Sequence, residues 1–88
     1  MKIFKYNANI TDMQTFEMPA GAQILSAKNQ HGELCLWVLV NENEPSMTQR
    51  HIEIIGTGNP IPQDMGIDRK FIDTVVINPF VWHVFERL

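Results

Sequence analysis

Residues 33–40 read Glu33-Leu34-Cys35-Leu36-Trp37-Val38-Leu39-Val40, and this stretch decides the fold class. Successive side chains of a β-strand point to opposite faces of the sheet. Here the even-numbered positions are all Leu or Val, and the odd-numbered ones from 35 to 39 are Cys, Trp and Leu, so both faces are apolar. A strand of this kind is typical of the centre of a sheet that is covered on both sides. We therefore predict a central strand in a protein with more than one layer.

Six further segments favour strands, because they alternate in polarity or are rich in β-branched and aromatic residues. They are residues 3–10, 14–18, 23–28, 49–55, 71–77 and 80–86. Helix is hard to place: Asp12 could cap a short one over 13–18, and a single turn could occupy residues 62–68. The sequence predicts a mainly β protein of six to seven antiparallel strands, in a small sandwich or barrel-like sheet pair with little or no helix.

Turn residues separate these segments. Gly32, at the end of Asn29–Gly32, can adopt the positive φ that a hairpin connection needs. The polar segment 41–48 contains Pro45 and reads as an exposed loop. A second loop begins at Gly56 and is expected to reach Asp68, which is long for a small domain and often indicates function.

Length and charge limit the classes of function. A chain of 88 residues predicts one domain, residues 1–88, with a modest core. The net charge is −3, and the seven basic residues form no cluster. Nucleic-acid binding is therefore not expected, because neutralising phosphates supplies most of the affinity of such proteins.

Cys35 is the only cysteine, so the chain can form no internal disulfide. A small secreted domain often needs such bridges, so we expect a cytoplasmic protein. Met1–Ile10 holds no apolar run long enough for a signal peptide or a membrane span. Cys35 lies in the most apolar segment, which predicts a buried, inert thiol rather than a nucleophile.

No catalytic or metal-binding set can be recognised. His31, His51 and His83 lack metal-ligand spacing, although His51 and His83 lie in expected strands and could meet across a sheet. The acidic residues do not form a pair that could be placed in one cleft, so a solvated surface is expected for them. They include Glu42, Glu44, Asp64, Asp68 and Asp73. We predict no catalytic residues, no metal and no cofactor, and a histidine-dependent hydrolase is the weakest of our hypotheses.

Gly56-Thr57-Gly58-Asn59 is the strongest candidate for a ligand-binding segment. Glycines after a strand allow backbone N–H groups to approach a bound anion. A dinucleotide fingerprint would need a third glycine where Ile61 stands, followed by a helix, and Pro60 and Pro62 disfavour that helix. A tight structural turn is the competing interpretation.

The C-terminal segment suggests an interface. Phe80, Trp82 and Val84 share one face, and Val81 and Phe85 make the other face apolar as well. This pattern fits either a second central strand or an edge strand that a partner chain buries. Most aromatic residues are assigned to the core, and any apolar surface left over would favour a protein interface.

Several stretches resemble a family of short phage and prophage proteins that has no established activity. They are 10–26, 35–40, 56–61 and 82–86. The resemblance places His rather than Asn at position 59, so a chemical role for that His would be missing from this chain. It implies a phage setting, in which small accessory proteins commonly bind and obstruct host or defence proteins.

Two hypotheses follow. The first is a phage- or prophage-encoded module that binds a protein partner, a second copy of itself included, through Phe80, Trp82 and Val84. The second is a small-molecule or nucleotide-binding protein that uses Gly56, Thr57, Gly58 and Asn59, with the 56–68 loop as a lid. Neither hypothesis requires a cofactor, nucleic acid or a membrane.

Overall fold

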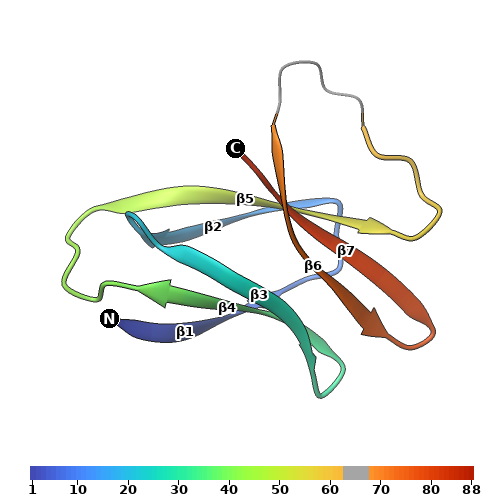
Figure 1. The fold of residues 1–88 in the computed structure, drawn as a ribbon, viewed down its shortest axis with the longest axis horizontal. Coiled ribbons are helices and arrows are strands. Elements are labelled where there is room, and N and C mark those ends of the chain that lie inside the picture. Colours follow the sequence, from blue (N-terminus) through green and yellow to red (C-terminus); the bar gives the residue numbers. More distant parts are fainter. Residues whose placement is uncertain (63–67) are drawn as a thin grey trace.

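The computed structural model describes residues 1–62 and 68–88, which form seven β-strands (Figure 1). The strands are β1 (Lys2–Ala8), β2 (Met13–Pro19), β3 (Gln23–Gln30), β4 (Glu33–Val40), β5 (Met47–Gly56), β6 (Arg69–Ile77) and β7 (Phe80–Arg87). Within these residues there is no helix, and so none that could cross a membrane. The middle of the expected 56–68 loop, most of the possible helical turn over 62–68, and Asp64 fall on residues 63–67, outside the described ranges. Asp68, where the loop was expected to end, directly precedes β6.

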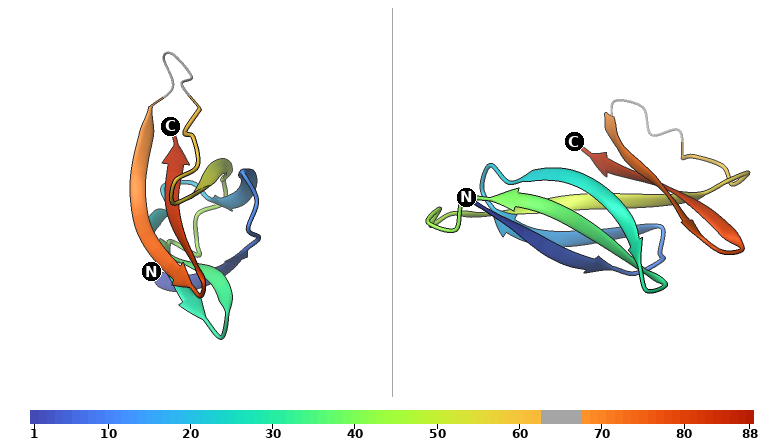
Figure 2. Two further views of the ribbon diagram at one scale, coloured as in Figure 1. Left: turned by 90° about the vertical axis from the view of Figure 1, so that its right-hand side faces the viewer. Right: turned by 60° about the horizontal axis from the view of Figure 1, so that its bottom comes forward.

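The strands form two antiparallel sheets. One has three strands in the order β1-β4-β3, and the other has four in the order β2-β5-β7-β6. Figure 2 shows the two sheets from further directions, with the long β5 passing behind the three-stranded sheet towards the β6–β7 hairpin. The predicted fold class, a small all-β sheet pair with six to seven strands, is confirmed.

β4 is the centre of the three-stranded sheet, as its sequence predicts. Leu34, Leu36, Val38 and Val40 are almost completely buried and face the second sheet, where they form most of this half of the core. The sequence predicted that the other face of β4 is buried as well, but on that face only Cys35 is fully buried. Trp37 and Leu39 are half-buried, because the described residues form two layers and none lies over this side.

Cys35 is fully buried, and its Sγ lies 3.4 Å from Oδ1 of Asn7 on the neighbouring strand. The expected buried thiol is therefore present. The β3–β4 turn has positive φ at both His31 (54°) and Gly32 (84°), so its two central residues twist the chain in the way that a tight hairpin favours.

The C-terminal strand lies inside the sheet. β7 pairs with β5 on one side and with β6 on the other, which decides between the two interpretations of its apolar faces in favour of a central strand. Val84 is fully buried between the sheets, packed with core residues from β5 and β6 such as Ile54 and Val75.

Side chains join the sheets where the edge strands β3 and β6 lie together. Asp73 accepts a hydrogen bond from the backbone N–H of Ala27, and Asn29 Nδ2 donates to the carbonyl oxygen of Val76 at 3.1 Å. Both strands carry a register shift, between Ile24 and Ser26 in β3 and between Phe71 and Asp73 in β6. A bulge turns a strand locally and re-aims its side chains. The shift in β6 comes immediately before Asp73, the residue that reaches across to β3.

Candidate functional site

The candidate site forms where β5 ends beside β7. In the antiparallel register Gly56 is the partner of Trp82, so the glycine loop and the C-terminal aromatic segment meet. A Cβ atom built on Gly56 would lie 2.7 Å from Nδ2 of Asn59 and 3.1 Å from Cζ3 of Trp82. Gly56 therefore allows both side chains to approach the backbone of β5.

The loop after β5 is a tight turn. The N–H of Asn59 donates to the carbonyl oxygen of Gly56 at 3.0 Å, and the N–H of Thr57 donates to that of Val81 at 3.1 Å. Gly58 has a φ of 86°, a conformation that residues with a Cβ rarely adopt. These bonds fix Gly56–Asn59 against β7. The segment is therefore a tight turn, the competing interpretation in the sequence analysis. The same turn shapes the surface around Trp82.

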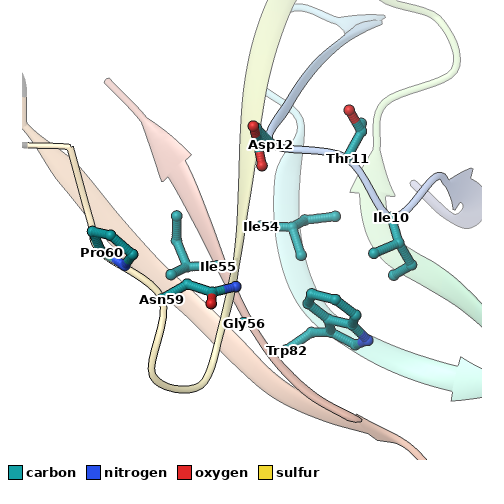
Figure 3. Close-up of a pocket in the computed structure, with 9 residues that line it drawn as sticks. All are labelled: Ile10, Thr11, Asp12, Ile54, Ile55, Gly56, Asn59, Pro60 and Trp82. Carbon is teal, nitrogen blue, oxygen red and sulfur yellow. The ribbon is translucent and has the colours of Figure 1, made fainter.

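Two cavities flank the Trp82 indole. The first, of about 260 Å³, is drawn in Figure 3. The second, of about 480 Å³, lies on the side of the β6–β7 turn. They share Gly56, Asn59 and Trp82; Ile10, Thr11, Asp12, Ile54, Ile55 and Pro60 complete the first, and Thr57, Pro79, Phe80 and Val81 complete the second. We call these residues together the Trp82 surface.

Phe80 is the most accessible aromatic side chain of the Trp82 surface. It is 59% exposed, and its ring centroid lies 5.8 Å from that of Trp82, at an interplanar angle of 43°. Ile10 is also exposed. Val84, grouped with Phe80 and Trp82 by the sequence, has no exposed surface, so of these three only Phe80 and the half-buried Trp82 can contact another molecule.

The only formal charge on the described Trp82 surface is negative. Among the described residues that line the two cavities, Asp12 is the only one with an ionisable side chain, and no Lys or Arg is present. The sequence analysis did not identify Asp12 as a site residue and named it only as a possible cap of a helix over 13–18, where the structure has strand β2 instead. The place of Asp12 next to the glycine loop depends on the pairing of β2 with β5, which no local pattern reveals.

The whole chain, residues 1–88, matches the family model of the domain of unknown function DUF7352. The chain belongs to this family. The comparisons with curated proteins and with solved structures found no match. The description of the DUF7352 family carries no activity, so the chemistry of this domain has to be inferred from its own residues.

The histidines of this DUF7352 domain do not form a catalytic pair. His51 is the cross-strand partner of Arg87, whereas His83 is the partner of Ile55, so the two rings do not meet as the sequence allowed. His51 Nδ1 lies 2.9 Å from the hydroxyl oxygen of Thr15. Groups of three or more His, Cys, Asp or Glu side chains that could hold a metal are absent from the residues described.

His83 lies between two threonine hydroxyl groups on the outer face of the four-stranded sheet. Its Nε2 is 2.7 Å from Oγ1 of Thr57, and its Nδ1 is 3.1 Å from Oγ1 of Thr74. These contacts link the glycine loop to β6 and β7. Their direct effect is to hold the loop that borders Trp82.

Two buried Arg–Glu pairs stabilise the sheet that carries the Trp82 surface, and the sequence analysis did not find them. Arg50 forms two hydrogen bonds with Glu86, one of them 2.9 Å long, and donates another to the carbonyl oxygen of Ala22 at 2.6 Å. The bonds to Glu86 raise the pKa of the Arg50 guanidinium, outweighing the opposite effect of its burial. Arg69 forms a similar two-bond pair with Glu53.

The pairs lie on opposite faces of the sheet, because Arg50 and Glu53 are an odd number of residues apart on β5. Glu53 and Glu86 are almost completely buried. Paired carboxylates of this kind are structural, and neither glutamate lines the two cavities at Trp82.

Proposed function

We propose that this domain is a small accessory protein, encoded by a phage or prophage and acting in the cytoplasm of the bacterial host, that binds a protein partner through the Trp82 surface. The partner is a host or defence protein, or a second copy of the chain. One observation carries the proposal: Phe80 is 59% exposed and packs against Trp82, and Trp82 lines both cavities.

An exposed aromatic side chain of this kind is costly in water and valuable in an interface. Aromatic residues dominate the binding energy of protein interfaces when they enter a pocket of the partner. The tight turn at Gly56 and the central position of β7 hold the Trp82 surface rigid, which lowers the entropic cost of binding. The resemblance of several sequence stretches to small phage proteins supports the biological setting.

The test compares two exposed phenylalanines. Phe80 is 59% exposed at the Trp82 surface, and Phe71 is 55% exposed on β6, with its ring against Phe85. The tagged wild-type chain, Phe80→Ala and Phe71→Ala are each used for affinity capture from phage-infected cells, and the mass of each purified chain is measured by light scattering. Both variants should keep the wild-type fold by circular dichroism.

We expect a stoichiometric partner, or a homodimer, that Phe80→Ala loses and Phe71→Ala retains. Cross-links from the partner should fall near Phe80 and Asn59. A monomeric chain with no stoichiometric partner would refute the proposal. Equal loss in both variants would place the interface elsewhere.

The second candidate is binding of a small molecule in the larger cavity. Its volume of about 480 Å³ falls within the range of pockets that hold small ligands. The absence of Lys and Arg from its described lining favours an uncharged ligand over a nucleotide, since phosphates need cationic or N–H partners. Native mass spectrometry of the purified protein tests this idea. A ligand at 100 times its dissociation constant adds about 2.7 kcal/mol of stability, which a thermal melt detects.

A further inference from the structure

The smaller cavity at Trp82 has a carboxylate at one end and apolar side chains along its wall. Figure 3 shows the Asp12 carboxylate at the upper end, the Trp82 ring at the lower end, and Ile54 between them, with Ile10 to one side. Among the residues that the structure describes, Asp12 has no hydrogen bond or ion pair through its side chain. The cavity thus combines an exposed carboxylate, which has no partner among the described residues, with a wall that includes Ile54 and Trp82.

The backbone fixes this arrangement. The pairing of β2 with β5 begins at Met13 and Glu53, and one further bond joins the N–H of Ile54 to the carbonyl oxygen of Asp12 at 3.2 Å. β5 then continues to Gly56, past Met13, the first residue of the antiparallel β2. Asp12 is therefore held at the last point of contact between the two strands, where the cavity opens beside the end of β5.

The size of the cavity limits its occupant. Its volume of about 260 Å³ lies below the roughly 300–1,000 Å³ that is typical of pockets for drug-sized ligands. One long side chain fits this volume better than a nucleotide or a cofactor. An anionic group would also be repelled by Asp12, since the described lining includes no Lys or Arg.

We infer that the smaller cavity receives a single lysine or arginine side chain of the partner protein. The aliphatic stem packs on Trp82 and Ile54, and the cationic head reaches the Asp12 carboxylate. Long basic side chains bind in this way, with the stem against apolar surface and the charge directed to a polar group. The exposed Phe80, which lines the larger cavity on the other side of Trp82, then contacts an apolar residue of the same partner.

Charge complementarity supports this choice of occupant. The chain has a net charge of −3, so a basic partner is attracted to it as a whole as well as to Asp12. The inference deepens the proposed protein-binding function, on which it rests, by naming the chemistry of the partner surface.

The test uses small probes, so that it needs no known partner. N-acetyl-lysine methylamide and N-acetyl-arginine methylamide are titrated into ¹⁵N-labelled protein, with the norleucine and citrulline analogues as neutral matches. A Trp37→Phe background leaves Trp82 as the only indole N–H signal. We expect saturable shifts at the Trp82 indole and the Asn59 side-chain amide for the basic probes, at least threefold tighter than for their neutral matches.

Asp12→Asn should weaken the basic probes at least threefold and leave the neutral ones unchanged. Its backbone bond to Ile54 does not involve the replaced carboxylate, and a wild-type ¹H–¹⁵N spectrum away from the cavity confirms that the fold is kept. Asp68→Asn removes the same charge from an exposed position before β6 and should change nothing. Equal binding of norleucine and lysine probes, or equal weakening by the two Asn variants, would overturn the inference.

The partner captured with the wild-type chain separates this inference from the proposed function. Loss of the partner in both Phe80→Ala and Asp12→Asn, with retention in Asp68→Asn, supports both. Loss in Phe80→Ala alone refutes the basic-side-chain site and leaves the protein-binding function standing. Asp12-dependent binding of the basic probes without any Phe80-dependent partner supports the site and refutes that function.

Discussion

The Asp73 carboxylate on β6 accepts a hydrogen bond from the backbone N–H of Ala27 on β3, across 3.3 Å. It also forms an ion pair with Lys28 at 3.0 Å. Ala27 is fully buried, so its N–H would lack a partner without Asp73. The Asp73 side chain thus satisfies a backbone N–H of a strand in the other sheet.

Asp73→Ala should therefore destabilise the domain by about 1–3 kcal/mol, the cost of leaving a buried donor unsatisfied. Lys28→Ala removes only the ion pair, and the Lys28 side chain is mostly exposed, so this change should cost less than about 1 kcal/mol. Urea denaturation of both variants measures the difference. Equal losses would mean that the ion pair, rather than the bond to Ala27, carries the effect.

The same carboxylate should make stability depend on pH in the acid range. Partial burial by itself raises the pKa of Asp73, but the bonds from Lys28 and from the N–H groups of Ala27 and Thr74 outweigh it, so the pKa is lowered. A lowered pKa in the folded state adds stability above the unfolded value of about 3.9, and this is lost as pH falls through the folded pKa.

Urea denaturation of the wild type and Asp73→Asn from pH 2 to pH 6 tests this. The stability difference should be largest above about pH 4 and shrink towards pH 2. A carbon-detected NMR titration should place the pKa of the Asp73 carboxyl below that of an unfolded Asp. A difference that grows as the pH falls would have the wrong sign for this contact.

Glu86→Leu should be among the most damaging single changes. It leaves the Arg50 guanidinium partly buried with no carboxylate to pair with, and breaking a buried pair costs about 3–5 kcal/mol. Adding Arg50→Met should recover much of that loss, because two apolar side chains of similar size can replace a buried ion pair. Denaturation of the single and double variants measures the coupling. A double variant no more stable than Glu86→Leu would contradict this account.

Gly56→Ala should disturb the Trp82 surface through contact rather than strain. The new Cβ would meet Nδ2 of Asn59 at 2.7 Å and Cζ3 of Trp82 at 3.1 Å, so the Trp82 indole N–H signal should shift. Gly58→Ala meets nothing within 4 Å, and its φ of 86° predicts a stability loss of about 1 kcal/mol with the indole signal unchanged. Adding Asn59→Ala to Gly56→Ala removes the closest contact and should restore part of the stability. No such recovery would place the main conflict at Trp82.

Much of the fold follows from sequence alternation. The apolar faces of residues 33–40 predicted β4 as the central strand, and the pattern of residues 80–86 allowed the central position that β7 has in its sheet. The Arg50–Glu86 pair was missed although its signal was present: Arg50 shares the parity of Ile52, and Glu86 that of Val84, so both charges point to the core. Charged residues in a strand were assumed to face solvent.

The candidate site depends on strand order, which alternation does not specify. Gly56-Thr57-Gly58-Asn59 and the segment from Phe80 were identified separately, and the pairing of β5 with β7 across the sheet brings them together. Asp12 joins them only because β2 runs beside β5. The position of Asp12 at this site could not be predicted from the sequence, because its loop carries no motif.

The side chains that bridge β3 and β6 also decide how copies of this domain can associate through their backbones. An unpaired edge strand is a template for a strand of another molecule. On β3 and β6 the Ala27 N–H and the Val76 carbonyl group are already engaged by Asp73 and Asn29, so a strand arriving there would have to displace both. Intermolecular strand pairing, including that which begins aggregation, is thereby directed to the opposite side of the sandwich, where β1 and β2 are the edges.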